Sequence, residues 1–160
     1  MRLALAFVAV VASALTLTGC TAPAPTYEQV RAETEEVLRQ VADRIPDPKE
    51  LEITEGIEPY SCSDALTLGD RSGSFYTGQW AVYVDDSFDV PSFISEFPEA
   101  LGAGWRAMDL GVSSSTGQIY LVRESPHMSL GIRELTIDGR KAIDLLAISR
   151  CGTLSEDQRP

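Results

Sequence analysis

The side chains with the widest range of possible chemistry in this chain are three thiols, Cys20, Cys62 and Cys151. A thiol can be acylated, oxidised to a disulfide or deprotonated to bind a metal, and its surroundings decide among these outcomes. A metal site would need further Cys or His at ligand spacing, and His127 is the only histidine of the chain. The three thiols must therefore be distinguished by the segments in which they stand.

Cys20 follows a segment that is typical of exported proteins. Arg2 provides a positive start, and residues 3–17 form an apolar run without a charge. This run is too short for a membrane-spanning helix, which needs roughly 20 residues. It fits the apolar core of a signal peptide, and Gly19 is a small residue at the expected cleavage site. The pattern predicts export.

The residues Leu17-Thr18-Gly19-Cys20 resemble the lipobox of bacterial lipoproteins. The resemblance implies that a diacylglycerol is attached to the Cys20 thiol through a thioether and that residues 1–19 are removed. Two acyl chains anchor a protein stably, since each buried CH2 contributes about 0.8 kcal/mol. The alternative is an ordinary secretory signal followed by an incidental cysteine. The scarcity of lysine and the small acidic body also resemble small lipoproteins of actinobacteria.

Cys62 and Cys151 remain as a pair. An exported protein meets an oxidising environment, which favours a disulfide between them. For a closed loop of roughly 90 residues, the chain-entropy model gives a stabilisation of about 4–5 kcal/mol. Two free buried thiols, or a contribution to a metal site, are the alternatives. We expect the disulfide.

The charge of the chain excludes one class of partner. Its formal net charge is −11, and removal of residues 1–19 takes away Arg2 and no acidic residue. Such a body lacks the clustered Lys and Arg that nucleic-acid binding requires, and anionic lipid head groups should repel it. We expect no nucleic-acid partner, and we expect the lipid on Cys20 to hold the protein on the extracytoplasmic face of the cell membrane.

The remaining reactive side chains form no recognisable catalytic or metal-binding pattern. His127 beside Pro126 is interpreted as a turn residue, because histidine catalysis needs orienting partners. Asp85, Asp86 and Asp89 offer oxygens to calcium, but their spacing differs from that of an EF-hand loop. Acidic residues at a helix N-terminus explain them as well. We predict no catalytic residue, no cofactor and no metal site.

Two helices are predicted. The first covers residues 27–45, with Thr26 as its N-cap and an apolar stripe at helical spacing. The second runs from Val90 or Pro91 to Leu101, and Pro98 is expected to split or kink it.

Strands are predicted from aromatic and β-branched content, over residues 78–84, 105–112, 118–124, 128–137 and 141–149. Residues 51–61 are ambiguous, and Asp138-Gly139 indicates a hairpin turn. Leu135 and Ile137 are out of phase with the preceding apolar residues, which suggests a bulge near Arg133-Glu134. Two segments that are apolar on both faces are expected to be central and covered, residues 119–122 and 145–148.

These elements predict an α+β fold, with an antiparallel sheet of about five strands and two helices packed on one face. Residues 20–26 would be a lipidated cysteine with a Pro/Ala/Thr tether, residues 27–152 a single domain and residues 153–160 a flexible tail. The open sheet face is the expected place for function, and four aromatic residues are candidates for it: Trp80, Tyr83, Trp105 and Tyr120. Core packing is the alternative for these rings.

Three functions are compatible with this organisation. The first is a membrane-anchored binding or interaction module without catalysis, with an envelope protein as a possible partner. The second is a carrier of a lipid or another apolar ligand. The third is a hydrolase of envelope material that uses two carboxylates, which would require an acidic cleft with raised pKa values.

Overall fold

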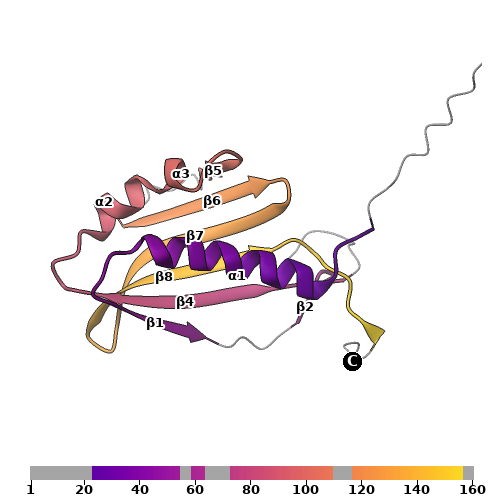
Figure 1. Ribbon diagram of the computed structural model, residues 1–160, viewed down its shortest axis with the longest axis horizontal. Helices are drawn as coiled ribbons and strands as arrows, with labels where there is room; N and C mark the ends of the chain where they lie inside the picture. Colours follow the sequence, from indigo (N-terminus) through magenta and orange to yellow (C-terminus); the bar gives the residue numbers. More distant parts are fainter. Residues whose placement is uncertain (1–22, 55–58, 64–72, 110–116, 157–160) are drawn as a thin grey trace, which may run out of the picture.

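The computed structural model describes residues 23–54, 59–63, 73–109 and 117–156. The export segment, Cys20 and residues 110–112 of the strand predicted over 105–112 lie outside these ranges. The described residues confirm the α+β plan: a six-stranded antiparallel sheet carries the helices, and a separate two-stranded sheet lies beside it (Figure 1).

The large sheet has the strand order β1-β4-β8-β7-β6-β5, and every neighbouring pair is antiparallel. Its strands are β1 (Lys49–Thr54), β4 (Thr77–Val84), β5 (Trp105–Ala107), β6 (Gln118–Glu124), β7 (His127–Ile137) and β8 (Arg140–Ser149). The small sheet pairs β2 (Tyr60–Ser61) with β3 (Ser74–Phe75). The sixth strand is β1, which comes from the ambiguous segment and lies at the edge of the sheet.

Helix α1 (Tyr27–Arg44) agrees with the first predicted helix. Thr26 and Gln29 form a capping box, in which each side chain accepts a hydrogen bond from the backbone N–H of the other residue. The helix ends before Pro46, which cannot continue it. The apolar stripe is buried, so the helix packs on the sheet through this face.

The second predicted helix is divided, as Pro98 indicates. Helix α2 (Val90–Ser95) begins at the N-cap Asp89 and has Pro91 in its first turn. Helix α3 (Phe97–Ala100) follows after Glu96, with Pro98 in its own first turn. Proline is tolerated there because the first N–H groups of a helix have no partner within the helix.

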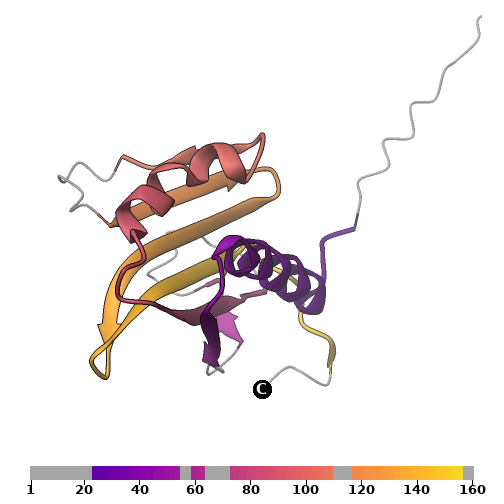
Figure 2. The ribbon, with the colours of Figure 1, turned by 60° about the vertical axis from the view of Figure 1, so that its left-hand side comes forward.

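The main core lies between the sheet and the helices, which cover one face (Figure 2). Its fully buried side chains come from all three helices and four strands, and include Leu38, Val41, Val90, Phe97, Val82, Leu121, Leu130, Ile132, Ile143 and Leu145. Along β4, Trp80 and Val82 face this core while Ala81 and Tyr83 face away, because successive side chains of a strand point to opposite faces.

The predicted bulge in β7 is wrong. The pairing of β7 with β8 runs without interruption from Met128 opposite Ser149 to Ile137 opposite Arg140. The phase change has another cause: Ile137 packs on the opposite face of the sheet, against a small cluster with Ala81, Tyr83 and Ala142. A sequence pattern cannot distinguish an inserted residue from a strand that contributes to two cores.

The prediction that residues 145–148 are covered on both faces is also wrong. Leu145 and Ala147 are fully buried beneath the helices, but Leu146 is only half-buried and Ile148 is 36% exposed on the other side. The strand is central in the sheet, yet no described helix lies over its second face (Figure 2).

The two ends of the domain are bound to each other. Tyr27 N donates to Thr153 O at 2.9 Å, and Thr153 N donates to Pro25 O at 2.9 Å. Gly152 exchanges backbone hydrogen bonds with Ser74, and a Cβ on Gly152 would lie 2.7 Å from backbone atoms of Thr26. The segment predicted as a flexible tail thus begins with ordered contacts.

Cys62 and Cys151 form the predicted disulfide, with a Cα–Cα distance of 6.2 Å. The bond joins the start of the turn after β2 to the residue that follows Arg150 at the end of β8. Cys151 directly precedes Gly152, which pairs with Ser74 of β3, and Thr153, which contacts Pro25. The disulfide therefore lies at the same end of the molecule as the contacts between Pro25 and Thr153.

Candidate functional site

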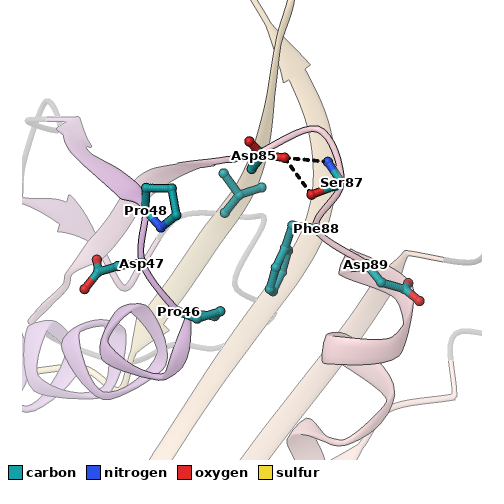
Figure 3. A pocket seen from close by; sticks show the side chains of 8 residues that line it. Pro46, Asp47, Pro48, Asp85, Ser87, Phe88 and Asp89 are labelled. Carbon is teal, nitrogen blue, oxygen red and sulfur yellow. Dashed lines mark hydrogen bonds between the residues drawn. The ribbon is translucent and has the colours of Figure 1, made fainter.

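The candidate site is a cleft of about 400 Å3 at the end of the sheet where α1 stops and α2 starts. One wall is the connection from α1 to β1, and the other is the connection from β4 to α2 (Figure 3). The lining residues are Pro46, Asp47, Pro48, Val84, Asp85, Ser87, Phe88 and Asp89.

Two lysines hold the walls of the cleft in place. Lys49 Nζ donates to the carbonyl oxygens of Ala42 at 2.7 Å and Ile45 at 2.6 Å, which satisfies the C-terminal end of α1. Lys141 Nζ, from β8, donates to the carbonyl oxygens of Asp86 and Phe88 at 2.5 and 3.2 Å. Each connection is therefore fixed by a cation that is bound to its backbone.

Four of the eight residues that line the cleft are apolar, and they form an apolar slot within it: Pro46, Pro48, Val84 and Phe88. Phe88 faces Pro46 and Pro48 across the gap (Figure 3). Its ring is half-buried, and it packs against Phe93 of α2 with a distance of 5.6 Å between the ring centroids. Such a slot suits a flat or aliphatic group that is narrow enough to enter between the ring and the prolines.

Carboxylates stand at the rim. Asp85 accepts hydrogen bonds from the Ser87 hydroxyl at 2.6 Å and from the Ser87 N–H at 2.9 Å. Asp89 accepts them from the Ser92 hydroxyl at 2.7 Å and from the Ser92 N–H at 3.1 Å. The side chains of Asp47 and Asp89 point outward on opposite sides of the gap (Figure 3).

These hydrogen bonds change the acidity of both rim residues. The Ser87 hydroxyl, helped by the Ser87 N–H, lowers the pKa of Asp85, and the Ser92 groups lower the pKa of Asp89 in the same way. The charge of Lys141 adds a smaller effect in the same direction for both residues. Both carboxylates are therefore ionised at neutral pH.

Of the acidic triplet Asp85, Asp86 and Asp89, the first and the last fix local backbone structure through their side chains. Asp85 closes a turn and Asp89 caps α2, as the helix-terminus interpretation expects. Within the described ranges, no group of three or more His, Cys, Asp or Glu side chains converges as metal ligands do. His127 is exposed at the start of β7, opposite Glu124.

The four aromatic residues that the sequence offers as candidates are divided between the two faces of the sheet. Trp80 is buried in the main core, and Trp105 packs against that core. Tyr83 is buried in the small cluster on the far face, and Tyr120 is half-buried beside Gly131 in a depression of about 70 Å3. This depression is much smaller than the cleft.

The far face of the sheet has a polar centre as well. Asp144 is only 3% exposed, and it accepts hydrogen bonds from Arg133 Nε at 2.8 Å and from Gln79 Nε2 at 3.0 Å. These bonds satisfy both carboxylate oxygens of Asp144. The hydrogen bonds from Arg133 and Gln79 explain how Asp144 can be buried on a face of the sheet over which no described helix lies.

Sequence reasoning missed Phe88, Pro46 and Pro48 as site residues. The two prolines were visible only as helix stops, and Phe88 only as one apolar residue before a helix. A weak signal was present, because both connections combine acidic residues with rigid or aromatic ones. Their meeting depends on the pairing of β1 with β4, which places Lys49 opposite Val84.

Comparison of the chain with family models, with curated proteins and with solved structures finds no match. Among the residues that the structure describes, no helix has both the length and the apolar character needed to cross a membrane.

Proposed function

We propose that the protein is a lipid-anchored binding module on the extracytoplasmic face of the cell membrane, and that the cleft takes a ligand with a positive charge and an apolar body. An organic ammonium ion, or a lysine or arginine side chain of an envelope protein, has this chemistry. The observation that carries the proposal is the combination of an apolar slot with ionised carboxylates at its rim.

The acidity of the rim supports binding over hydrolysis. A carboxylate pair that performs acid–base chemistry usually contains one group with a raised pKa, which can donate a proton at neutral pH. The pKa values of Asp85 and Asp89 are both lowered. The two ionised carboxylates attract a cation, and neither Asp85 nor Asp89 carries a proton to donate at neutral pH.

The position of the cleft supports a partner outside the bilayer. Pro25 is fixed to the domain through Thr153, so about five residues, with a reach of about 17 Å when extended, would separate the lipid on Cys20 from the body. Helix α1 has 18 residues and is therefore about 27 Å long. Pro46, Asp47 and Pro48, which line the cleft, follow the C-terminal end of this helix, far from Pro25.

A titration with a small probe tests the proposal. The probe is n-butylammonium, which is added to the lipidated protein in detergent micelles, and its binding is followed by NMR. We expect binding with a dissociation constant on the order of 1 mM, as for other small fragments. In the variant Asp85→Asn with Asp89→Asn, the affinity should fall about tenfold, because two charges are lost.

The asparagine variant is chosen to preserve the fold. Asparagine accepts the same backbone hydrogen bonds at a turn and at an N-cap. The matched control is Glu36→Gln with Glu134→Gln, which removes two exposed charges outside the cleft. Equal affinity in the asparagine variant and the control would contradict the proposed charge recognition.

The apolar walls also favour a second candidate, a carrier of an uncharged apolar ligand. The cleft exceeds the roughly 300 Å3 at which ligand pockets begin. The neutral probe n-butanol separates the two functions. Binding of n-butanol as tight as that of n-butylammonium would favour the carrier and contradict cation recognition.

A further inference from the structure

Strand β1 leaves one edge of the large sheet open. It is the last strand in the order, and within the described part of the chain no strand pairs with its outer side. All its residues except Lys49 are exposed. The backbone N–H and C=O groups on such an edge can pair with a further extended chain. The opposite edge strand, β5, has only three residues.

The two faces of β1 have different chemistry. Leu51 and Ile53 are 44% and 52% exposed, and they share the helix-bearing face with their partners Val82 and Trp80. They are two of the largest exposed apolar side chains of the described chain. A strand added beside them would cover both side chains if it carried apolar residues at alternate positions.

The other face of β1 is acidic. Glu50 Oε2 accepts a hydrogen bond from Arg140 at 2.6 Å, and Glu52 Oε2 accepts one from the Tyr83 hydroxyl at 2.8 Å. Both glutamates are exposed. The Oε1 atom of each makes no hydrogen bond to a described residue, so each keeps an oxygen that can accept one from a neighbouring strand.

A second copy of the chain does not fit this edge. Copies related by a two-fold axis pair antiparallel. Two antiparallel registers of β1 with the β1 of a second copy pair five residues and keep the helices of both copies on the same side of the sheet. In one register Glu52 lies opposite Glu50 of the second copy, and in the other it lies opposite Glu52 of the second copy. Like charges directly across a strand pair are destabilising.

We propose that β1 accepts an extended segment of another protein as a further strand, and that this segment alternates basic and apolar residues. Its basic side chains meet Glu50 and Glu52, and its apolar side chains cover Leu51 and Ile53. This surface is separate from the cleft, because no residue of β1 lines the cleft.

Hydrogen–deuterium exchange with model peptides tests this inference. The full-length chain in micelles is mixed with a capped peptide of alternating lysine and valine, or with a capped peptide of alternating glutamate and valine. We expect the lysine peptide to slow amide exchange in residues 49–54 and the glutamate peptide to leave it unchanged. Protection by both peptides or by neither would overturn the proposal.

Two variants separate the contributions of the two faces. Glu50→Gln with Glu52→Gln should weaken binding of the lysine peptide roughly fivefold, as expected for the loss of two exposed ion pairs. Leu51→Thr with Ile53→Thr places a β-branched side chain with high strand propensity at both positions while it removes apolar contact, and it should also weaken binding.

The oligomeric state is measured by sedimentation without peptide. A monomer supports the proposal. A dimer whose residues 49–54 are protected from exchange would assign the edge to a second copy and overturn it. The outcome is independent of n-butylammonium binding at the cleft, so the two proposals can fail separately.

Discussion

At the scale of single residues, the acidic side chains of this protein have different structural roles, and their spacing in the sequence does not reveal them. Asp85 and Asp89 bind neighbouring serines and stay at the surface. Asp144 is buried and is neutralised by Arg133. The formal charge of −11 predicted repulsion of anionic partners, but it gave no indication of which carboxylates gather around an apolar slot.

The lowered pKa values of Asp85 and Asp89 predict a pH dependence of stability. Each carboxylate stabilises the folded state above its unfolded pKa of about 3.9. This contribution is lost as the pH falls through the lower folded pKa, since the Ser87 and Ser92 bonds favour the ionised form. We expect the Tm of the parent to fall more steeply below about pH 4 than that of the Asp85→Asn with Asp89→Asn variant.

Thermal unfolding followed by circular dichroism between pH 2 and pH 7 provides the measurement. Asparagine does not titrate, so the difference in Tm between the two proteins should change only in the acidic range. A difference that stays constant over the whole range would show that the two carboxylates titrate alike in the folded and unfolded states.

At the scale of elements, the close approach of α1 to β4 depends on a residue without a side chain. A Cβ on Gly78 would lie 2.5 Å from Leu38 Cδ1 and 3.0 Å from Tyr76 Cε1. Leu38 is fully buried, so it has no solvent-filled space into which it can move. Gly78 therefore sets how closely the helix packs on the strand.

Substitution of Gly78 by alanine should overpack this contact. We expect Gly78→Ala to lower the free energy of unfolding by about 1–3 kcal/mol, measured by urea titration of the full-length chain. Leu38→Ala alone should cost about 2–5 kcal/mol. In the double variant the added methyl occupies part of the vacated space, so its cost should be smaller than the sum. An additive cost would contradict a direct clash between the two side chains.

At the scale of the whole molecule, the cleft lies at the end of the domain opposite Pro25, the residue that would follow the predicted lipid tether. The disulfide and the hydrogen bonds between Tyr27, Pro25 and Thr153 gather at one end. The cleft lies at the other end of α1, and β1 runs along one edge of the sheet (Figure 1). A body anchored through the residues before Pro25 would present both surfaces to the aqueous envelope.

Anchoring itself is tested by Cys20→Ala. The variant lacks the thiol that would carry the diacylglycerol, so we expect it to leave the membrane fraction and to lack the mass of two acyl chains. Cell fractionation and intact-mass measurement of both proteins provide the readout. If the variant stays with the membranes as the parent does, the lipid on Cys20 is not what anchors the protein.

Local patterns in the sequence were sufficient to predict the capped first helix, the break at Pro98, the strand over residues 78–84 and the pairing of Cys62 with Cys151. These features depend on neighbours in the chain, or on the only two cysteines left to pair. The export signal and the lipid on Cys20 also come from the sequence alone, and they stay predictions. Only the tertiary structure brought Phe88 opposite Pro46, divided the apolar residues of β7 between two cores and placed β1 at an open edge, because each of these depends on which strands pair and in which register.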